Sequence, residues 1–276
     1  SLATPDVAAA AVAAAFAAAT SAAAIREAKD GLMRLGITTC RGERASLGEK
    51  EEMRELVKTL CDKSDVSSMR AFSREGQWDL VVSDTQLFRS SPFFMAARAV
   101  VPDGNDADQF NWFCDQHRAA LDFTQIGRVR QVIRNGLLRS EFEVKVGMAP
   151  VALGLPLSIT GWIVTTANIL ESSAAPLTTA PSAVQAKDAR DVERDIDVWT
   201  LAVKSVQVEE SNIPILRNML DTWLQLPIAP ITSALESTSV KVETWRPTPL
   251  FRTRYVDEKM RVSVDQDDNL FVYIRS

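Results

Sequence analysis

The chain has 276 residues, of which 46% are hydrophobic and 24% are charged. This composition is typical of a soluble globular protein with room for one sizeable domain and an accessory segment. The net charge of −5 argues against nucleic-acid binding, which needs a concentrated basic face. Three cysteines, Cys40, Cys61 and Cys114, lack metal-binding spacing and indicate reduced thiols in a reducing compartment.

Residues 8–24 are almost pure alanine, and the capping sequence Thr4-Pro5-Asp6 precedes them. Alanine is the strongest helix former, so we expect a helix that continues to about Leu35. Three settings for this helix stay open: packing in a soluble assembly, a membrane environment, or the remnant of a targeting sequence. No arginine precedes Arg26, unlike a basic transit peptide, and the absence of an initial Met suggests a processed chain.

A second helix is predicted over residues 46–62. Ser46 and Glu49 have the spacing of a capping box. Apolar side chains then recur at intervals of three and four, which is the pattern of a helix lying on a core. These residues are Met53, Leu56, Val57 and Leu60.

Further helices are predicted after the first strand, over residues 90–97 and 106–121, and they would cap the mouth of a barrel. Residues 171–195 are rich in Ser, Ala, Thr and Pro and then in charge, and predict an exposed loop. Residues 213–226 predict one more helix, which prolines terminate.

The strand Gly76–Asp84 opens with glycine, a spacer and Trp78, which would plug one end of a barrel. Asn135-Gly136 predicts a tight hairpin. The other strands are predicted over 127–134, 137–146, 157–169 (with a bulge or corner at Gly161-Trp162), 196–208, 250–256, 260–264 and 269–275. Together they predict a closed or nearly closed antiparallel up-and-down barrel, with Arg275 of the last strand stacked on Trp78.

The fold class is therefore mainly β with helices (α+β), with a helical region over residues 1–66 and a barrel domain over 67–276. The charged faces of the central hairpin carry Arg128, Arg130 and Arg134, which we expect to pair with glutamates across the ladder. This ladder has two open interpretations, a solvated charged surface or a contact patch for acidic lipids.

Several segments in this order resemble the plastid lipid-associated protein family, the fibrillins. They are Arg41-Gly42, the strand over 76–84, Ser90-Ser91-Pro92-Phe93-Phe94, and the hairpin segment 126–131. The most specific is the ending, Tyr255-Val256-Asp257-Glu258-Lys259-Met260-Arg261-Val262-Ser263 followed by Leu270-Phe271-Val272-Tyr273. The similarity covers roughly residues 41–276.

The resemblance implies a lipocalin-like barrel in the plastid (chloroplast), at the thylakoid or plastoglobule and more on the stromal side, that binds a lipid, quinone or carotenoid. It also implies that Asp257 and Arg261 form the family's terminal motif, either touching a ligand or fixing a turn. The alanine-rich helix and the insertion at 171–195 depart from the family pattern. They favour the alternative of a structural or assembly subunit docked to a photosynthetic membrane complex.

The residues give little support for catalysis. Cys114 and His117, the only histidine, are three apart on a predicted helix, but nothing nearby supplies an oxyanion hole or an orienting group. Two ligands are too few for structural zinc, and the acidic residues near 257–268 lack calcium-loop spacing. We therefore expect no enzyme activity, no catalytic residues, no metal and no covalent cofactor.

Binding needs only a dry cavity, and a barrel of eight strands either fills with side chains or holds one small ligand. Both outcomes stay open for this chain. The candidate lining residues share a large or branched apolar side chain on a predicted strand: Trp78, Leu80, Val82, Val129, Phe142, Val144, Trp162, Trp199, Tyr255, Val262 and Val272.

Overall fold

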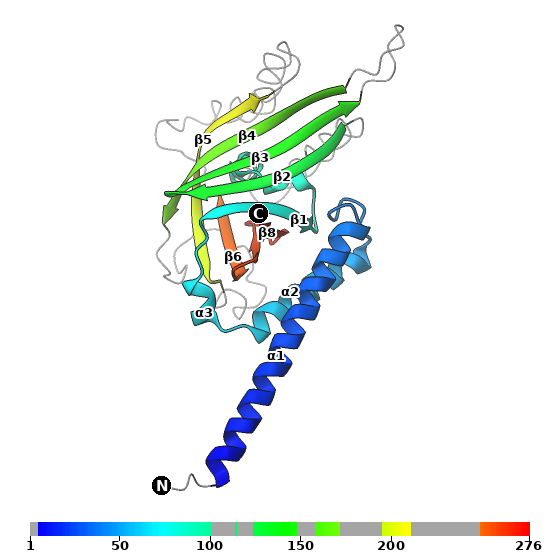
Figure 1. Ribbon diagram of the computed structural model, residues 1–276. Helices are drawn as coiled ribbons and strands as arrows, with labels where there is room; N and C mark the ends of the chain where they lie inside the picture. The colour runs from blue at the N-terminus through cyan, green and yellow to red at the C-terminus, as the bar shows by residue number, and fades with distance from the viewer. Residues whose placement is uncertain (1–4, 101–113, 115–123, 148–157, 172–194, 211–248) are drawn as a thin grey trace.

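The computed structural model describes residues 5–100, 114, 124–147, 158–171, 195–210 and 249–276 (Figure 1). Eight strands form one closed barrel in which each strand pairs antiparallel with the next and β8 pairs with β1. The strands are β1 (Gly76–Ser83), β2 (Thr124–Arg134), β3 (Leu137–Gly147), β4 (Ser158–Glu171), β5 (Asp197–Glu209), β6 (Leu250–Val256), β7 (Met260–Val264) and β8 (Leu270–Arg275). The predicted up-and-down barrel is confirmed.

The described helices lie before β1 and between β1 and β2. They are α1 (Pro5–Thr38), α2 (Leu47–Lys63), α3 (Val66–Ala71), the 3-10 helix η1 (Leu87–Ser90) and α4 (Pro92–Val100). The capping box of α2 is present, because Glu49 and Ser46 bond reciprocally. The predicted helices over 106–121 and 213–226, and the predicted loop over 171–195, lie almost entirely outside the described residues.

The hairpin between β2 and β3 turns at Asn135 and Gly136, whose φ angles of 51° and 70° are those of the tight turn that this dipeptide predicts. The predicted bulge at Gly161-Trp162 is wrong. The β3–β4 ladder continues through Gly161, and the irregularity of β4 falls between Thr166 and Ala167, in its pairing with β5. A glycine within a strand therefore did not mark the bulge here.

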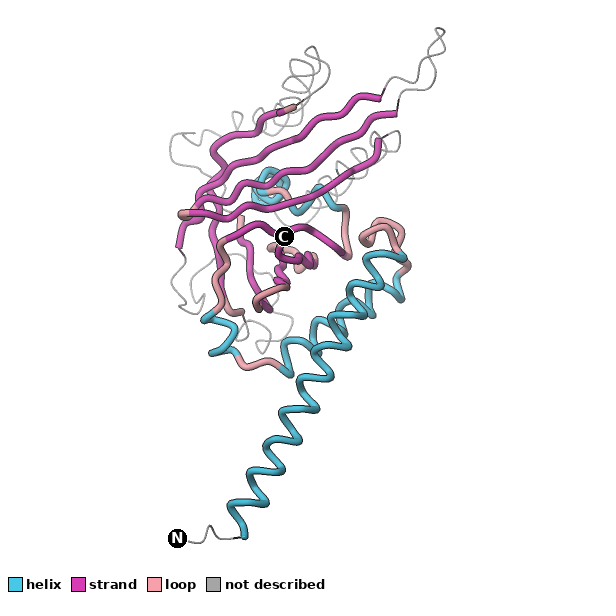
Figure 2. The backbone as a smooth tube through the Cα atoms, viewed as in Figure 1, coloured by secondary structure: helices cyan, strands magenta, loops and turns pink. Residues whose placement is uncertain are grey.

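Helices α1 and α2 pack against each other and cover the outer side of the barrel near β1 and β6 (Figure 2). The C-terminal half of α1 contributes Leu32 and Leu35 to the core, and α2 contributes the residues of its predicted apolar stripe. Because the barrel residues in this cluster include outward-facing valines of β1, β7 and β8, the helices and the outer barrel surface share one core.

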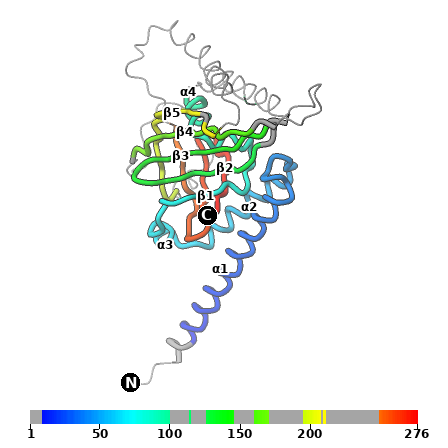
Figure 3. The backbone as a smooth tube through the Cα atoms, turned by 45° about the horizontal axis from the view of Figure 1, so that its top comes forward, coloured from blue at the N-terminus to red at the C-terminus, as the bar shows by residue number. Residues whose placement is uncertain are grey.

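The N-terminal half of α1 extends away from the barrel (Figures 1 and 3). Val12 is 71% exposed and Phe16 is 76% exposed. From residue 9 to residue 38 the helix is long and apolar enough to cross a membrane, by length and composition only, with a mean hydropathy of 1.5. Core helices and signal sequences pass the same test, so this finding leaves the setting of the helix open.

One end of the barrel is closed around Trp78, which is fully buried. The guanidinium carbon of Arg275 lies 4.2 Å from the centre of the indole ring, as the sequence predicts. Arg275 also donates hydrogen bonds to the carbonyls of Ser73, Glu75 and Glu258, at 2.7, 2.7 and 2.8 Å. The last strand is thereby tied to the segment that enters the first.

Candidate binding site in the barrel interior

The register separates the predicted lining residues into two groups, because alternate residues of a strand face opposite sides and paired residues face the same side. Six of them share the inward face: Trp78, Leu80, Val129, Phe142, Val144 and Trp199. The others share the outward face: Val82, Trp162, Tyr255, Val262 and Val272.

Register shifts explain two of the five outward residues, Val82 and Tyr255, whereas Val262 and Val272 lie on regular strands next to the inward Arg261 and Tyr273. One lies between Leu80 and Val82 and another between Thr253 and Tyr255, and each reverses the alternation that a regular strand would keep. Tyr255 therefore faces α1, where Lys29 Nζ lies 5.5 Å from its ring centre. Trp162 needs no bulge, because it pairs with the outward residue Glu143.

Arg261 on β7 faces the barrel interior, and its charged side chain is 0% exposed. Aromatic rings surround it: its guanidinium carbon is 4.5 Å from the ring centre of Tyr273, 5.3 Å from Trp78, and 5.8 Å from both Trp199 and Phe251. Burial lowers the pKa of Arg261 to about 10, so the group keeps its charge at neutral pH. The charged guanidinium group of Arg261 is therefore buried among the aromatic side chains of the barrel interior.

A polar row crosses the inner surface of the barrel beside this cation. Gln131, Ser140 and Thr165 are register partners on β2, β3 and β4 and are all buried. Gln131 Oε1 accepts a hydrogen bond from Arg261 Nη2, and its Nε2 donates to the Ser90 carbonyl at 3.2 Å. Ser91 Oγ and Thr165 Oγ1 are 3.0 Å apart, so η1 and the start of α4 reach into the barrel.

Several buried polar atoms of this interior have no hydrogen-bond partner within the residues that the structure describes. They are Arg261 Nε and Nη1, Ser140 Oγ, Thr253 Oγ1 and Ser263 Oγ. The Tyr273 hydroxyl lies beside Ser90 but makes no hydrogen bond of normal geometry. Because buried polar groups are nearly always satisfied, this concentration marks the interior as a candidate binding site.

Sequence reasoning missed this polar row. The signal was available, because Gln131 and Ser140 are single polar residues at inward positions between apolar ones. To recognise the polar row from the sequence, one must know which residues pair between neighbouring strands. The hairpin at Asn135 fixes this pairing for β2 and β3, but not for the strands across the barrel.

Asp257 and Arg261, the two residues of the terminal motif expected from the sequence, lie on different sides of the barrel wall. Asp257 Oδ1 accepts the backbone N–H groups of Lys259 and Met260 at 2.8 and 2.7 Å, so it shapes the β6–β7 turn. Its Oδ2 accepts from Tyr255 and Lys29. Burial disfavours the carboxylate charge, but these hydrogen bonds outweigh it and lower the pKa of Asp257. Asp257 therefore fixes a turn and anchors α1, whereas Arg261 faces the interior.

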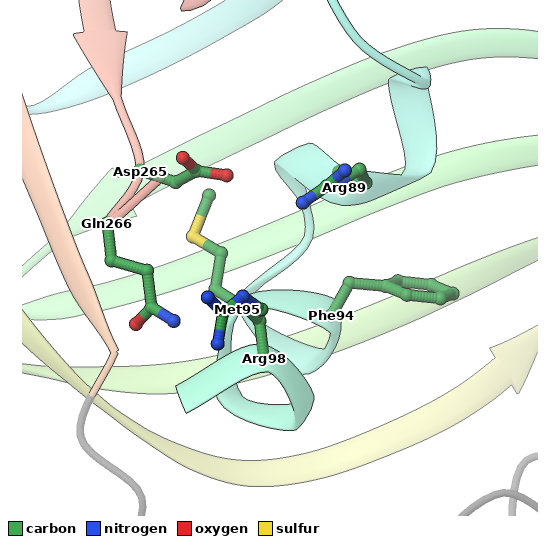
Figure 4. Close-up of a pocket in the computed structure, with 6 residues that line it drawn as sticks. All are labelled: Arg89, Phe94, Met95, Arg98, Asp265 and Gln266. Carbon is green, nitrogen blue, oxygen red and sulfur yellow. The ribbon is translucent and has the colours of Figure 1, made fainter. Parts of the chain in front are cut away.

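A shallow pocket lies between α4 and the β7–β8 turn (Figure 4). It is lined by Arg89, Phe94, Met95, Arg98, Asp265 and Gln266. Burial raises the pKa of Asp265 to about 6. Its Oδ1 accepts the N–H groups of Asp267 and Asn269, both at 2.9 Å, so this carboxylate holds the turn together.

Groups that would support metal or thiol chemistry are scarce in the described part of the chain. No cluster of three or more His, Cys, Asp or Glu residues with metal-binding geometry occurs among the described residues. Cys114 is buried in an apolar cluster with Phe88, Phe93 and Phe94, and His117 lies outside the described residues.

Comparison with known proteins adds no assignment. No family model, no curated protein and no solved structure matches this chain.

Proposed function

We propose that this chain is a non-enzymatic binding protein that holds a hydrophobic or amphiphilic ligand in its barrel. The supporting observation is the buried interior, where apolar inward-facing residues meet polar atoms that have no hydrogen-bond partner in the described part of the chain. A barrel of eight strands has the diameter for one small ligand. The resemblance to plastid lipid-associated proteins supports a lipid, quinone or carotenoid as the ligand and the thylakoid or plastoglobule as its location.

The proposal is tested by purifying the full chain, extracting it with organic solvent and identifying the extract by mass spectrometry. We expect a lipid or isoprenoid close to equimolar with the protein, and saturable quenching of tryptophan fluorescence by a plastoquinone analogue. The inward positions of Trp78 and Trp199 make this signal sensitive to an interior ligand. A clean extract together with no saturable binding would contradict the proposal.

A second function is favoured by α1. Its exposed half carries Val12 and Phe16 four residues apart, so both side chains lie on one side of the helix. The surrounding alanines permit close approach of another helix. We propose that α1 docks the barrel to a photosynthetic membrane complex, which is compatible with ligand binding inside the barrel.

Removal of residues 1–23 is expected to release the protein from the membrane fraction without unfolding the barrel. Residues 9–23 are exposed apart from the half-buried Ser21, so the free energy of unfolding should change by less than about 0.5 kcal/mol. Co-sedimentation with thylakoids and urea denaturation measure the two effects.

Removal of residues 1–30 is the matched control, because it also deletes the buried Ala28 and the ion pair between Lys29 and Asp257. We expect this longer deletion to destabilise the barrel as well. Docking through α1 is contradicted if the chain that lacks residues 1–23 still co-sediments with the membranes.

A further inference from the structure

Aromatic rings contact the guanidinium group of Arg261, but among the described residues only some of its N–H groups have a hydrogen-bond acceptor. The rings of Trp78 and Tyr273 are within cation–π distance. The N–H donors lie in the guanidinium plane and need acceptors there. Gln131 accepts from Nη2, while Nε and Nη1 have no acceptor among the described residues. Within the described part of the chain, two of the three guanidinium nitrogens of Arg261 therefore lack a hydrogen-bond acceptor.

The charge of Arg261 is also uncompensated. No carboxylate of the described residues lies within ion-pair distance of Arg261. Asp197 also faces the interior by its register with Thr253, but it is engaged by Arg74 at 3.2 Å and by the indole N–H of Trp199 at 2.8 Å. Burying a lone cation is costly, and a neutral ligand would leave that cost in place.

Hydroxyl groups lie where they would complete an anion site. Ser263 is two residues from Arg261 on the same face of β7, and Thr253 is the register partner of Ser263 on β6. Both hydroxyls are buried and form no hydrogen bond with any described residue, and a hydroxyl donates to an anion as readily as to water. Apolar inward residues, including Val129 and Phe142, provide surface for a chain attached to the anion.

We infer that Arg261 binds the carboxylate of the ligand, with Ser263 and Thr253 as further donors. This inference rests on the proposed ligand-binding function and narrows the ligand class from neutral quinones and carotenoids to carboxylates. A carboxylate supplies both the acceptor and the negative charge that the site lacks, and hydrogen bonds between charged partners are the strong ones. The carboxylate belongs either to an acyl chain or to a small free acid.

The test compares palmitate, methyl palmitate and acetate by calorimetry with the full chain. The ester has the same chain without the charge, and acetate has the charge without the chain. We expect palmitate to bind about ten- to hundred-fold more tightly than the ester, the range for hydrogen bonds to a charged group. Arg261→Gln should remove this preference by weakening palmitate alone, and Arg261→Lys should keep part of it.

Arg254→Gln is the matched control, because Arg254 is paired with Asp268 near the surface and should not affect either ligand. If the wild-type protein binds palmitate and its ester equally tightly, the carboxylate inference is overturned. This comparison needs only the wild type, so it remains decisive even if Arg261→Gln fails to fold. Acetate that binds as tightly as palmitate assigns the site to a small acid. If palmitate, the ester and the quinone analogue all fail to bind, the proposed function falls as well.

Discussion

Gly42→Ala is expected to lower the free energy of unfolding by about 3 kcal/mol or more. Gly42 has a φ angle of +93°, which costs other residues on the order of 1 kcal/mol or more. A Cβ atom there would lie 1.7 Å from the Ser83 carbonyl oxygen, so the backbone of the turn or of β1 must move. Urea denaturation followed by circular dichroism measures the loss.

Gly48→Ala is the matched control. Gly48 is the second residue of α2, and a Cβ atom added there meets nothing within 4 Å. Because alanine is the better helix former, this variant should be as stable as the wild type or more stable by up to about 1 kcal/mol. Equal destabilisation of both variants would show that the contact between Gly42 and β1 does not matter.

The turn at Gly42 matters because it positions the helices on the barrel. The Arg41 carbonyl accepts the Ser83 N–H at 3.0 Å, and Arg41 Nη2 donates to the Ile126 carbonyl at 2.5 Å. The turn therefore touches β1 and β2 at once. Helix α1, which carries the proposed docking surface, is held at this end by the turn and along its length by the core that it shares with α2 and the barrel.

Local signals in the sequence were sufficient for the strands and their order. The dipeptide at Asn135 set one hairpin, apolar runs separated by short turns set the others, and Trp78 and Arg275 indicated that the two ends meet. Because the strands pair antiparallel in chain order without crossovers, pairing of the last strand with the first closes the barrel. The strands, their order and the closure could be predicted because each depends either on residues adjacent in the chain or on the one recognisable contact between Trp78 and Arg275.

The facing of individual side chains was harder to predict, because a bulge of one residue reverses every later position of a strand. Tyr255 was expected inside and faces α1 instead, because an extra residue of β6 precedes it, and Val262 faces outward because it alternates with the inward Arg261. Arg261 is the opposite case. A lone arginine in a strand otherwise made of small and apolar residues was visible, but its burial depends on rings from four other strands.

Trp78→Ala is expected to cause the largest loss of stability, about 3 to 5 kcal/mol of unfolding free energy. The side chain is fully buried, and its removal leaves a cavity at the closed end of the barrel. Both Arg261 and Arg275 would lose the ring over which they lie. Denaturation in urea provides the measurement, and the slope of the transition checks that unfolding remains two-state.

Trp162→Ala removes the same side chain from the outer face, where Arg130 lies 5.4 Å from the ring centre. This control should lose no more than about 1 to 2 kcal/mol, because one exposed cation–π contact and a half-buried surface are at stake. Similar losses at the two positions would contradict the view that Trp78 seals the barrel. A large loss of stability in Trp78→Ala alone would show that the indole of Trp78, next to the buried Arg261 of β7, is needed to close this end of the barrel.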